Sequence, residues 1–207
     1  MKKLNLIKKN FEENGYVKIN KILSNSEVSK ILNEINNIKN KFLNIKNPNL
    51  HLTKDKKINT IHDINKFISS EILEKFSKNK KLVKIIEHIL EKKTLVRNME
   101  FFLKPKKTGK KSPVHQDNFY WNIKNKKALN VWLACTESNK NNGGVFYFKK
   151  SHKGGILAHE LSFQAGSSQQ IPDRIVKKMR YQKFFPNLRR GDCIILICKL
   201  SNGSNKN

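Results

Sequence analysis

Cysteine is scarce in this chain, and long apolar runs are missing. The three cysteines, Cys135, Cys193 and Cys198, are an odd number without C-x-x-C spacing. They predict neither a disulfide framework nor a zinc knuckle, and we expect buried, unreactive thiols in a reducing compartment. No run of about eighteen apolar residues is present, and no apolar leader follows the lysine-rich start. These absences predict a cytoplasmic protein without a membrane partner.

Acidic residues are also few, since 16 Asp and Glu stand against 43 Lys and Arg and give a formal charge of +27. Such a charge favours nucleic acid as a partner, because lysine and arginine gain affinity for phosphates by releasing counterions. Only five of the basic residues are arginines, however, and lysine runs through the whole chain. A dedicated nucleic-acid protein concentrates arginine and aromatic residues on one element. We therefore expect a small-molecule substrate, while the oligomeric state is left open.

The length of the chain predicts one domain over residues 1–207, because 207 residues with 37% apolar content suffice for one core and do not need two. Residues 1–93 are mainly helical by pattern. Ser24 and Glu27 have capping-box spacing ahead of an apolar stripe at helical intervals. Two more helices are expected further along, separated near Asn79, and residues 44–66 predict a loop with room for a short strand.

From residue 94 the pattern changes to short β-prone runs separated by Gly, Pro and Asn. The runs are Thr94–Leu103, Leu129–Cys135, Val145–Phe148 and Cys193–Cys198. Helices followed by strands predict an α+β domain. In it the N-terminal helices buttress one face of a β sandwich or barrel built from residues 94–207.

The most informative local pattern is His115-Gln116-Asp117. In an extended segment, residues two apart project to the same face, so the His115 imidazole and the Asp117 carboxylate can converge on one ion. This donor pair suits Fe(II), and a triad of two histidines and one carboxylate leaves positions open for a chelating cosubstrate and dioxygen. Alone, an H-x-D pattern is more often a surface or hydrogen-bonded pair, so its context decides.

Several further segments, in the same order along the chain, resemble the phytanoyl-CoA dioxygenase family of Fe(II)/2-oxoglutarate-dependent oxygenases. They are Phe11–Val17, Lys104-Pro105 with Gly109, His115–Asp117 with Tyr120, Asn130–Ala134, Asn141–Gly144 with Ser151–Gly155, and Gly191-Asp192. The resemblance spans most of residues 11–204. It implies a double-stranded β-helix, the cupin-like jelly roll, with Fe(II) as the metal and 2-oxoglutarate as cosubstrate. It also implies hydroxylation of a small or acyl-type substrate.

The resemblance assigns roles to single positions. His115 and Asp117 match the first two iron ligands, which makes them the candidate catalytic pair. Lys104, Trp132 and Ser204 match positions around 2-oxoglutarate, where an ammonium can pair with a carboxylate. The alternatives are a solvated lysine for Lys104 and a plain core residue for Trp132. The remaining histidines are assigned to surface or structural roles; they are His51, His62, His88, His152 and His159.

The chain departs from the family at the third ligand. Asn202 stands where the family has its second metal-binding histidine, and a neutral amide oxygen is a poor ligand for Fe(II). The family also has a basic residue further on that holds the distal carboxylate of 2-oxoglutarate, whereas this sequence ends at Asn207. We therefore expect a β-helix that is incomplete at its C-terminal end and low or absent turnover. The alternative is a non-catalytic remnant or binding module with the same fold.

Overall fold

The computed structural model describes residues 1–42, 49–121, 123, 128–164 and 167–205. Its α-helices are α1 (Lys2–Asn14), α2 (Asn25–Phe42), α3 (Glu71–Ser77), α4 (Lys80–Leu90), α5 (Asp117–Trp121) and α6 (Asp173–Lys178). Three 3₁₀ turns are η1 (Ile64–Lys66), η2 (Lys140–Asn142) and η3 (Ser151–Gly154). The strands are β1 (Tyr16–Ile19), β2 (Leu50–Leu52), β3 (Ile58–Ile61), β4 (Phe101–Phe102), β5 (Ser112–His115), β6 (Leu129–Leu133), β7 (Val145–Phe148), β8 (Glu160–Leu161), β9 (Gln169–Gln170), β10 (Lys183–Phe184), β11 (Cys193–Ile197) and β12 (Asn202–Ser204).

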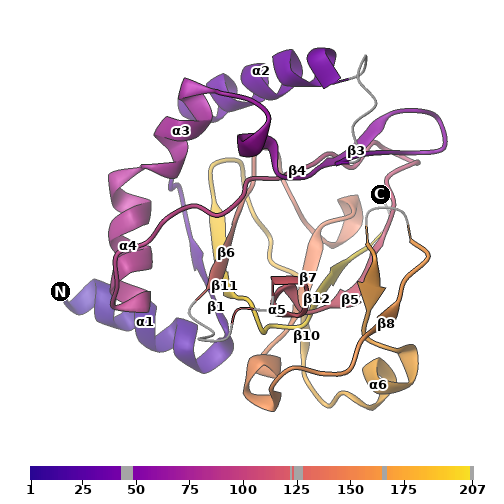
Figure 1. Cartoon of the computed structure of the whole chain (residues 1–207). Helices are drawn as coiled ribbons and strands as arrows, with labels where there is room; N and C mark the ends of the chain where they lie inside the picture. The colour runs from indigo at the N-terminus through magenta and orange to yellow at the C-terminus, as the bar shows by residue number, and fades with distance from the viewer. Residues whose placement is uncertain (43–48, 122, 124–127, 165–166, 206–207) are drawn as a thin grey trace.

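Two antiparallel sheets form the centre of the molecule (Figure 1). One has the strand order β1-β11-β6 and the other β10-β7-β12-β5. Small sheets β2-β3-β4 and β8-β9 lie beside them. The expected α+β class is confirmed, and the sheets are antiparallel. Strand β1 adds a strand from the start of the chain to the sheet β1-β11-β6, outside the predicted β region of residues 94–207.

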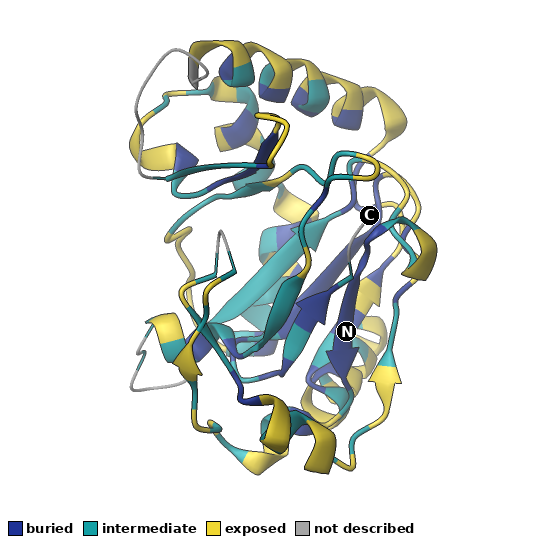
Figure 2. Cartoon of the chain, turned by 90° about the vertical axis from the view of Figure 1, so that its right-hand side faces the viewer, coloured by how far each residue is buried: buried dark blue, intermediate teal, exposed yellow. Residues whose placement is uncertain are grey.

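Strand β11 separates two apolar clusters, because alternate side chains of a strand point to opposite faces. Cys193 and Ile195 belong to the cluster that contains the buried residues of helices α1–α4. Ile194 and Leu196 belong to a second cluster with Tyr147 of β7, between the two central sheets. Figure 2 shows the buried strands at the centre and the helices exposed on their outer faces. The inner faces of the two sheets therefore define the interior in which a site can form.

The helix boundaries follow the local signals in the sequence. The Glu27 backbone N–H donates to the Ser24 hydroxyl at 3.2 Å, and the Ser24 N–H donates to the Glu27 carboxylate at 2.7 Å, which is the expected capping box. Asn79 separates α3 from α4 by accepting a hydrogen bond from the Leu82 N–H at 3.0 Å. These two predictions are confirmed because a cap depends only on residues a few positions apart.

Two predictions of strands were wrong in detail. Residues 94–100 form no strand. At Met99 the backbone N–H donates to the Asn65 side chain and the carbonyl accepts from the Ile64 N–H, so both groups bond to residues 64–65 and not to a neighbouring strand. Within residues 44–66, the described part contains the β2–β3 hairpin and η1 rather than one short strand, and residues 44–48 lie outside the described residues.

The cysteines lie in the interior as expected, with Cys193 and Cys198 buried and Cys135 half-buried. Burial raises the pKa of the Cys193 thiol to about 12, and it raises the pKa of Cys135 and of Cys198 to about 11. Thiols with such pKa values stay protonated at neutral pH and are poor nucleophiles and poor metal ligands.

The turn before β11 depends on Gly191 and Asp192. Gly191 has a φ of +84°, and a Cβ atom there would lie 2.4 Å from the Leu23 carbonyl oxygen. The Asp192 carboxylate is 4% exposed, accepts hydrogen bonds from the N–H groups of Lys21 and Arg189, and pairs with Lys18 at 3.0 Å. Burial alone would raise the pKa of Asp192, but these donors outweigh burial and hold that pKa below the ordinary value of 3.8.

Asp192→Ala should lower the free energy of unfolding by roughly 3 kcal/mol, because it leaves buried donors and a lysine without their acceptor. Urea unfolding at neutral pH measures this difference, with the exposed Asp173→Ala as a control that changes stability by less than about 0.5 kcal/mol. Since the pKa of Asp192 is depressed in the folded state, its contribution is present above pH 3.8 and is lost as the pH falls further. Equal stability of the two variants would contradict this account.

Candidate metal centre

The side chains of His115 and Asp117 meet between the two central sheets. His115 is the last residue of β5 and Asp117 is the first residue of α5. Their Nε2 and Oδ1 atoms are 3.3 Å apart, and the two side chains are 17% and 13% exposed. The expected convergence is therefore present, although Asp117 lies at the start of a helix and not on the strand. The two side chains converge because the chain turns at Gln116, and not because they alternate along one strand.

The second nitrogen of His115 is already engaged, since Nδ1–H donates to the Pro113 carbonyl at 2.9 Å. That bond directs the Nε2 atom toward Asp117. Burial lowers the pKa of His115, but the Asp117 carboxylate, the bond to the Pro113 carbonyl and the charge of Glu100 together outweigh burial, and the net pKa lies above the ordinary 6.5. A divalent metal ion between His115 and Asp117 would displace the proton from His115 Nε2, because a histidine ligand must be neutral.

Asp117 and His115 have further neighbours that orient them. Asn130 of β6 donates from its side-chain amide to Oδ2 of Asp117 at 3.4 Å. The ring of Tyr120 lies edge-on to His115, with 5.7 Å between the ring centroids, while its hydroxyl donates to the Gln169 carbonyl at 2.5 Å. Sequence reasoning missed Asn130, and the available signal was a polar residue inside an otherwise apolar strand.

Asn202 lies directly across from His115, because the two residues are partners in the β12–β5 register. Its amide nitrogen donates to the Leu200 carbonyl at 3.2 Å and is 3.5 Å from the His115 carbonyl oxygen. The amide oxygen is thus what Asn202 can offer to an ion. Within the residues that the structure describes, no cluster of three or more His, Cys, Asp or Glu is arranged to hold a metal. The three candidate donors are compatible with a divalent cation: His115 Nε2 and the Asp117 carboxylate are good ligands, and the Asn202 amide oxygen is a weak one.

Two of the candidate cosubstrate residues meet although they are a hundred positions apart. The Lys104 ammonium donates to the Ser204 hydroxyl at 2.5 Å and to the Asn205 carbonyl. Burial lowers the pKa of Lys104 to about 8. Lys104 is therefore not a solvated lysine, and its partly desolvated ammonium is suited to pair with a carboxylate.

Trp132 lies on the same face of β6 as Asn130 and packs against the cluster between the two sheets. Its ring is tilted against Phe102 of β4, with 5.0 Å between the centroids. Trp132 thus lies on the interior face of β6, the same face from which Asn130 contacts Asp117. It is part of the core as well as a candidate wall of the site.

A carboxylate that the sequence did not indicate lies near His115. Glu100 pairs with Nδ1 of His62 at 3.0 Å, and its charge helps to raise the pKa of His115. The ring of His51 packs edge-on against His62, with 5.1 Å between the centroids. His51 lies in β2, His62 directly follows β3 and Glu100 directly precedes β4, so only the folded chain brings this group together.

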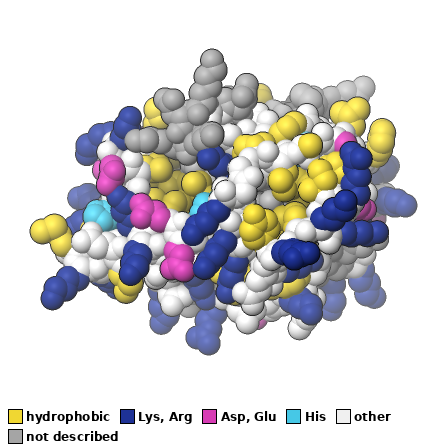
Figure 3. All heavy atoms as spheres, turned by 90° about the horizontal axis from the view of Figure 1, so that it is seen from below, with side chains coloured by type: hydrophobic (Ala, Val, Ile, Leu, Met, Phe, Trp, Pro, Cys, Tyr) yellow, Lys and Arg dark blue, Asp and Glu magenta, His cyan; other side chains and the backbone are white. Residues whose placement is uncertain are grey.

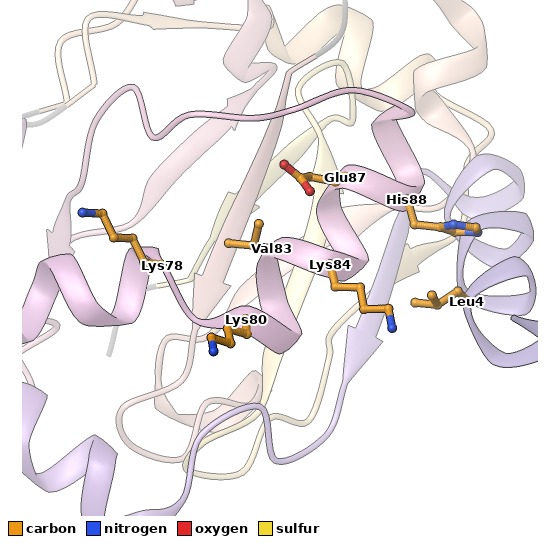
Figure 4. A pocket seen from close by; sticks show the side chains of 7 residues that line it. All are labelled: Leu4, Lys78, Lys80, Val83, Lys84, Glu87 and His88. Atoms are coloured by element: carbon orange, nitrogen blue, oxygen red, sulfur yellow. The ribbon is translucent and has the colours of Figure 1, made fainter.

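The other histidines have structural partners. His152 donates from Nε2 to the Glu12 carbonyl at 3.0 Å. His88 joins α4 to α1 through a 2.9 Å bond from Nε2 to Asn5. It also borders a surface hollow of about 450 Å³ along α4, lined by Leu4, Lys78, Lys80, Val83, Lys84, Glu87 and His88 (Figure 4). In Figure 4 the labelled side chains come from α1, the end of α3 and α4 and do not converge on one point, so this hollow offers no second set of converging ligands.

Comparison with known proteins decides the family. A family model described as phytanoyl-CoA dioxygenase (PhyH) matches residues 11–207. The chain belongs to the phytanoyl-CoA dioxygenase family. It is 24% identical over 164 residues to the peroxisomal phytanoyl-CoA dioxygenase of Bos taurus and 23% identical over 217 residues to that of Rattus norvegicus.

These alignments cover 74% and 97% of the chain, but only 49% and 63% of the bovine and rat proteins. This family member therefore spans about half to two thirds of the length of the curated relatives it matches. Among solved structures it resembles EctD from S. alaskensis with 2-oxoglutarate and 5-hydroxyectoine. The TM-score is 0.80 with 18% identity, and the match covers 97% of this chain and 69% of that one. This likeness shows the jelly-roll fold that is shared with Fe/2-oxoglutarate oxygenases.

The face of this family member that is seen from below is basic without a local focus. Figure 3 shows lysine and arginine side chains spread over the lower face, between patches of hydrophobic side chains. The prediction that nucleic acid is not a partner stays a prediction. In the described ranges, no helix combines the length and the apolar character that crossing a bilayer requires.

Proposed function

We propose that this chain is a cytoplasmic, single-domain oxygenase dependent on Fe(II) and 2-oxoglutarate. It would hydroxylate a small or acyl-type substrate, with low turnover because Asn202 replaces the second histidine ligand. The observation that carries the proposal is the convergence of His115 Nε2 and Asp117 Oδ1, 3.3 Å apart, in the interior between the two sheets. Membership in the phytanoyl-CoA dioxygenase family supports the choice of metal and cosubstrate. When bound, Fe(II) and 2-oxoglutarate supply the activation of dioxygen.

The residues of the chain have separate tasks in this proposal. His115 and Asp117 hold the metal, and Asn202 occupies the third position with a neutral amide oxygen. Asn130 orients Asp117 through its hydrogen bond to Oδ2. Lys104, with Ser204 beside it, binds a carboxylate of 2-oxoglutarate, and Trp132 limits the entry of water from the side of β6. We assign the catalytic role to His115 and Asp117 because they would bind the metal directly.

A second candidate function is a binding module that keeps the fold without turnover. Asn202 is the observation that favours it, because replacing an imidazole by an amide oxygen weakens the affinity for Fe(II). The two candidates differ in a measurable quantity, which is the Fe(II) affinity of the unaltered chain.

Anaerobic titration of the protein with Fe(II) and 2-oxoglutarate distinguishes the two functions. An oxygenase should develop the weak visible charge-transfer band of a 2-oxo acid chelated at iron, followed by release of succinate after addition of oxygen. A flat spectrum at millimolar Fe(II) would exclude the oxygenase and leave the binding module. His115→Ala is the matched negative control, because it removes one of the two good donors.

Lys104→Met should weaken binding of 2-oxoglutarate by roughly tenfold to a hundredfold, because it removes a charge-assisted hydrogen bond of about 1.5–3 kcal/mol. The measurement is the 2-oxoglutarate concentration that gives half of the visible band at saturating metal. Lys106→Met, at an exposed position two residues away, should leave this concentration unchanged. An equal effect of both substitutions would remove Lys104 from the site.

A further inference from the structure

We propose that His159 is a positioning residue for the two metal ligands, and this inference rests on the proposed function. His159 precedes β8, more than forty positions after the ligands, and belongs to none of the motifs in the sequence. Its Nε2 atom accepts a hydrogen bond from the backbone N–H of Gln116 at 3.1 Å. That N–H belongs to the residue between His115 and Asp117, so its orientation sets the angle between the two ligands.

The Gln116 N–H has a particular need for this acceptor. The chain leaves β5 at His115 and enters α5 at Asp117, so Gln116 belongs to neither element. Gln116 is fully buried, and a buried N–H without an acceptor costs about 1–3 kcal/mol. In place of a strand carbonyl, the imidazole of His159 supplies the acceptor. The turn between the ligands is therefore closed by a side chain from a distant segment.

The tautomer and the ring plane of His159 are both set by its surroundings. Its Nδ1–H donates to the Leu157 carbonyl at 2.9 Å, which leaves the lone pair on Nε2 for the Gln116 N–H. The ring stacks on Phe119 of α5, with 4.0 Å between the centroids and 18° between the planes. His159 thus contacts the residue before Asp117 and a residue two positions after it. Both contacts act on the first turn of α5, which presents the Asp117 carboxylate.

The Gln116 side chain also bonds to the segment that contains His159, so the His159 contact is one of several between this segment and the turn at Gln116. The amide nitrogen donates to the carbonyls of Gly155 at 2.8 Å and Lys199 at 2.6 Å. The amide oxygen accepts from the Leu157 N–H at 2.8 Å. Residues 155–159 therefore hydrogen-bond to both the backbone and the side chain of Gln116. Among these bonds, the one to His159 holds the backbone N–H of Gln116, between the two proposed ligands.

Two substitutions separate the acceptor from the stacked ring. His159→Phe keeps an aromatic ring against Phe119 and removes the acceptor. His159→Gln removes the ring, but its amide oxygen reaches the place of Nε2 and can accept from the Gln116 N–H. His88→Phe is the control, because His88 forms its bond to Asn5 away from the site. If His159→Phe does not fold, His159→Leu takes its place as the variant without an acceptor.

Co(II), which reports its coordination through its visible spectrum, is titrated into the wild type and into each variant. The melting temperature of each metal-free protein is measured alongside. We expect His159→Phe to bind Co(II) about tenfold more weakly with an altered spectrum, because residues that orient metal ligands contribute about 10- to 100-fold to affinity. His159→Gln should restore both the affinity and the spectrum, and His88→Phe should match the wild type.

The outcomes distinguish the inference from the function on which it rests. If the wild type binds Co(II) and His159→Phe binds it equally well, the positioning role is wrong while the metal site stands. If His159→Phe and His159→Gln lose the same affinity, an acceptor at position 159 does not restore the site, and the inference is again overturned. A wild type that binds no Co(II) overturns the proposed function, and the inference with it.

Discussion

Asn202→His should raise the affinity of the chain for Fe(II) by roughly a hundredfold, which corresponds to about 2.8 kcal/mol. Asn202 faces His115 in the register of β12 and β5, so an imidazole at this position starts from the strand opposite the first ligand. Imidazole is a far better donor to Fe(II) than a neutral amide oxygen. The substitution also completes a triad of two histidines and one carboxylate. It is therefore expected to give the largest gain of any single change in this chain.

Calorimetric titration with Fe(II) under anaerobic conditions measures that gain, and the visible band with 2-oxoglutarate reports whether the new ligand leaves room for the cosubstrate. Asn187→His is the matched control, because it adds a histidine at an exposed position outside the site. An unchanged affinity in Asn202→His would mean that position 202 does not face the metal. The assignment of the third ligand position would then be wrong.

Asp117→Ala should reduce Fe(II) binding by more than about a hundredfold and bring it close to the level of non-specific association, because it removes the anionic donor of the pair. Its effect on folding should be small by comparison, because without Asp117 the buried His115 can stay neutral and keeps its hydrogen bond from Nδ1 to the Pro113 carbonyl. Metal affinity and unfolding by urea, measured on the same preparation, separate the two effects. A parallel loss of stability would indicate that the His115–Asp117 pair serves the fold.

Asp117→Asn provides a second comparison at the same position. The amide keeps the size of the side chain and its hydrogen bond with Asn130 but carries no charge. We expect it to bind Fe(II) about as weakly as the alanine variant. If Asp117→Asn bound the metal like the wild type, charge would not be the basis of the site, and the iron assignment would lose its chemical reason.

Several features could be predicted from the sequence because they depend on neighbours along the chain. The capping box of Ser24 and Glu27 and the break at Asn79 are of this kind. The H-x-D pattern also placed His115 and Asp117 together, although the reason is a turn into α5 and not strand alternation. Local sequence determines these features, so no knowledge of the tertiary fold was needed.

Other features depend on segments that only the folded chain brings together. Lys104 meets Ser204 across a hundred positions, and the resemblance to a family, rather than any local pattern, paired them. Asn130 was noted only as part of a resembling strand and His159 belongs to no motif, yet Asn130 contacts Asp117 and His159 contacts the turn between His115 and Asp117. The strand predicted from Thr94 onward is absent over residues 94–100. A β-prone pattern cannot show whether a partner strand exists.

The most direct test of the account is a crystal of the protein grown anaerobically with Fe(II), examined by anomalous diffraction at the iron edge. The account predicts one strong peak within bonding distance of His115 Nε2 and Asp117 Oδ1, on the side that faces Asn202. A peak held by other residues, or no peak at this position at millimolar Fe(II), would contradict it.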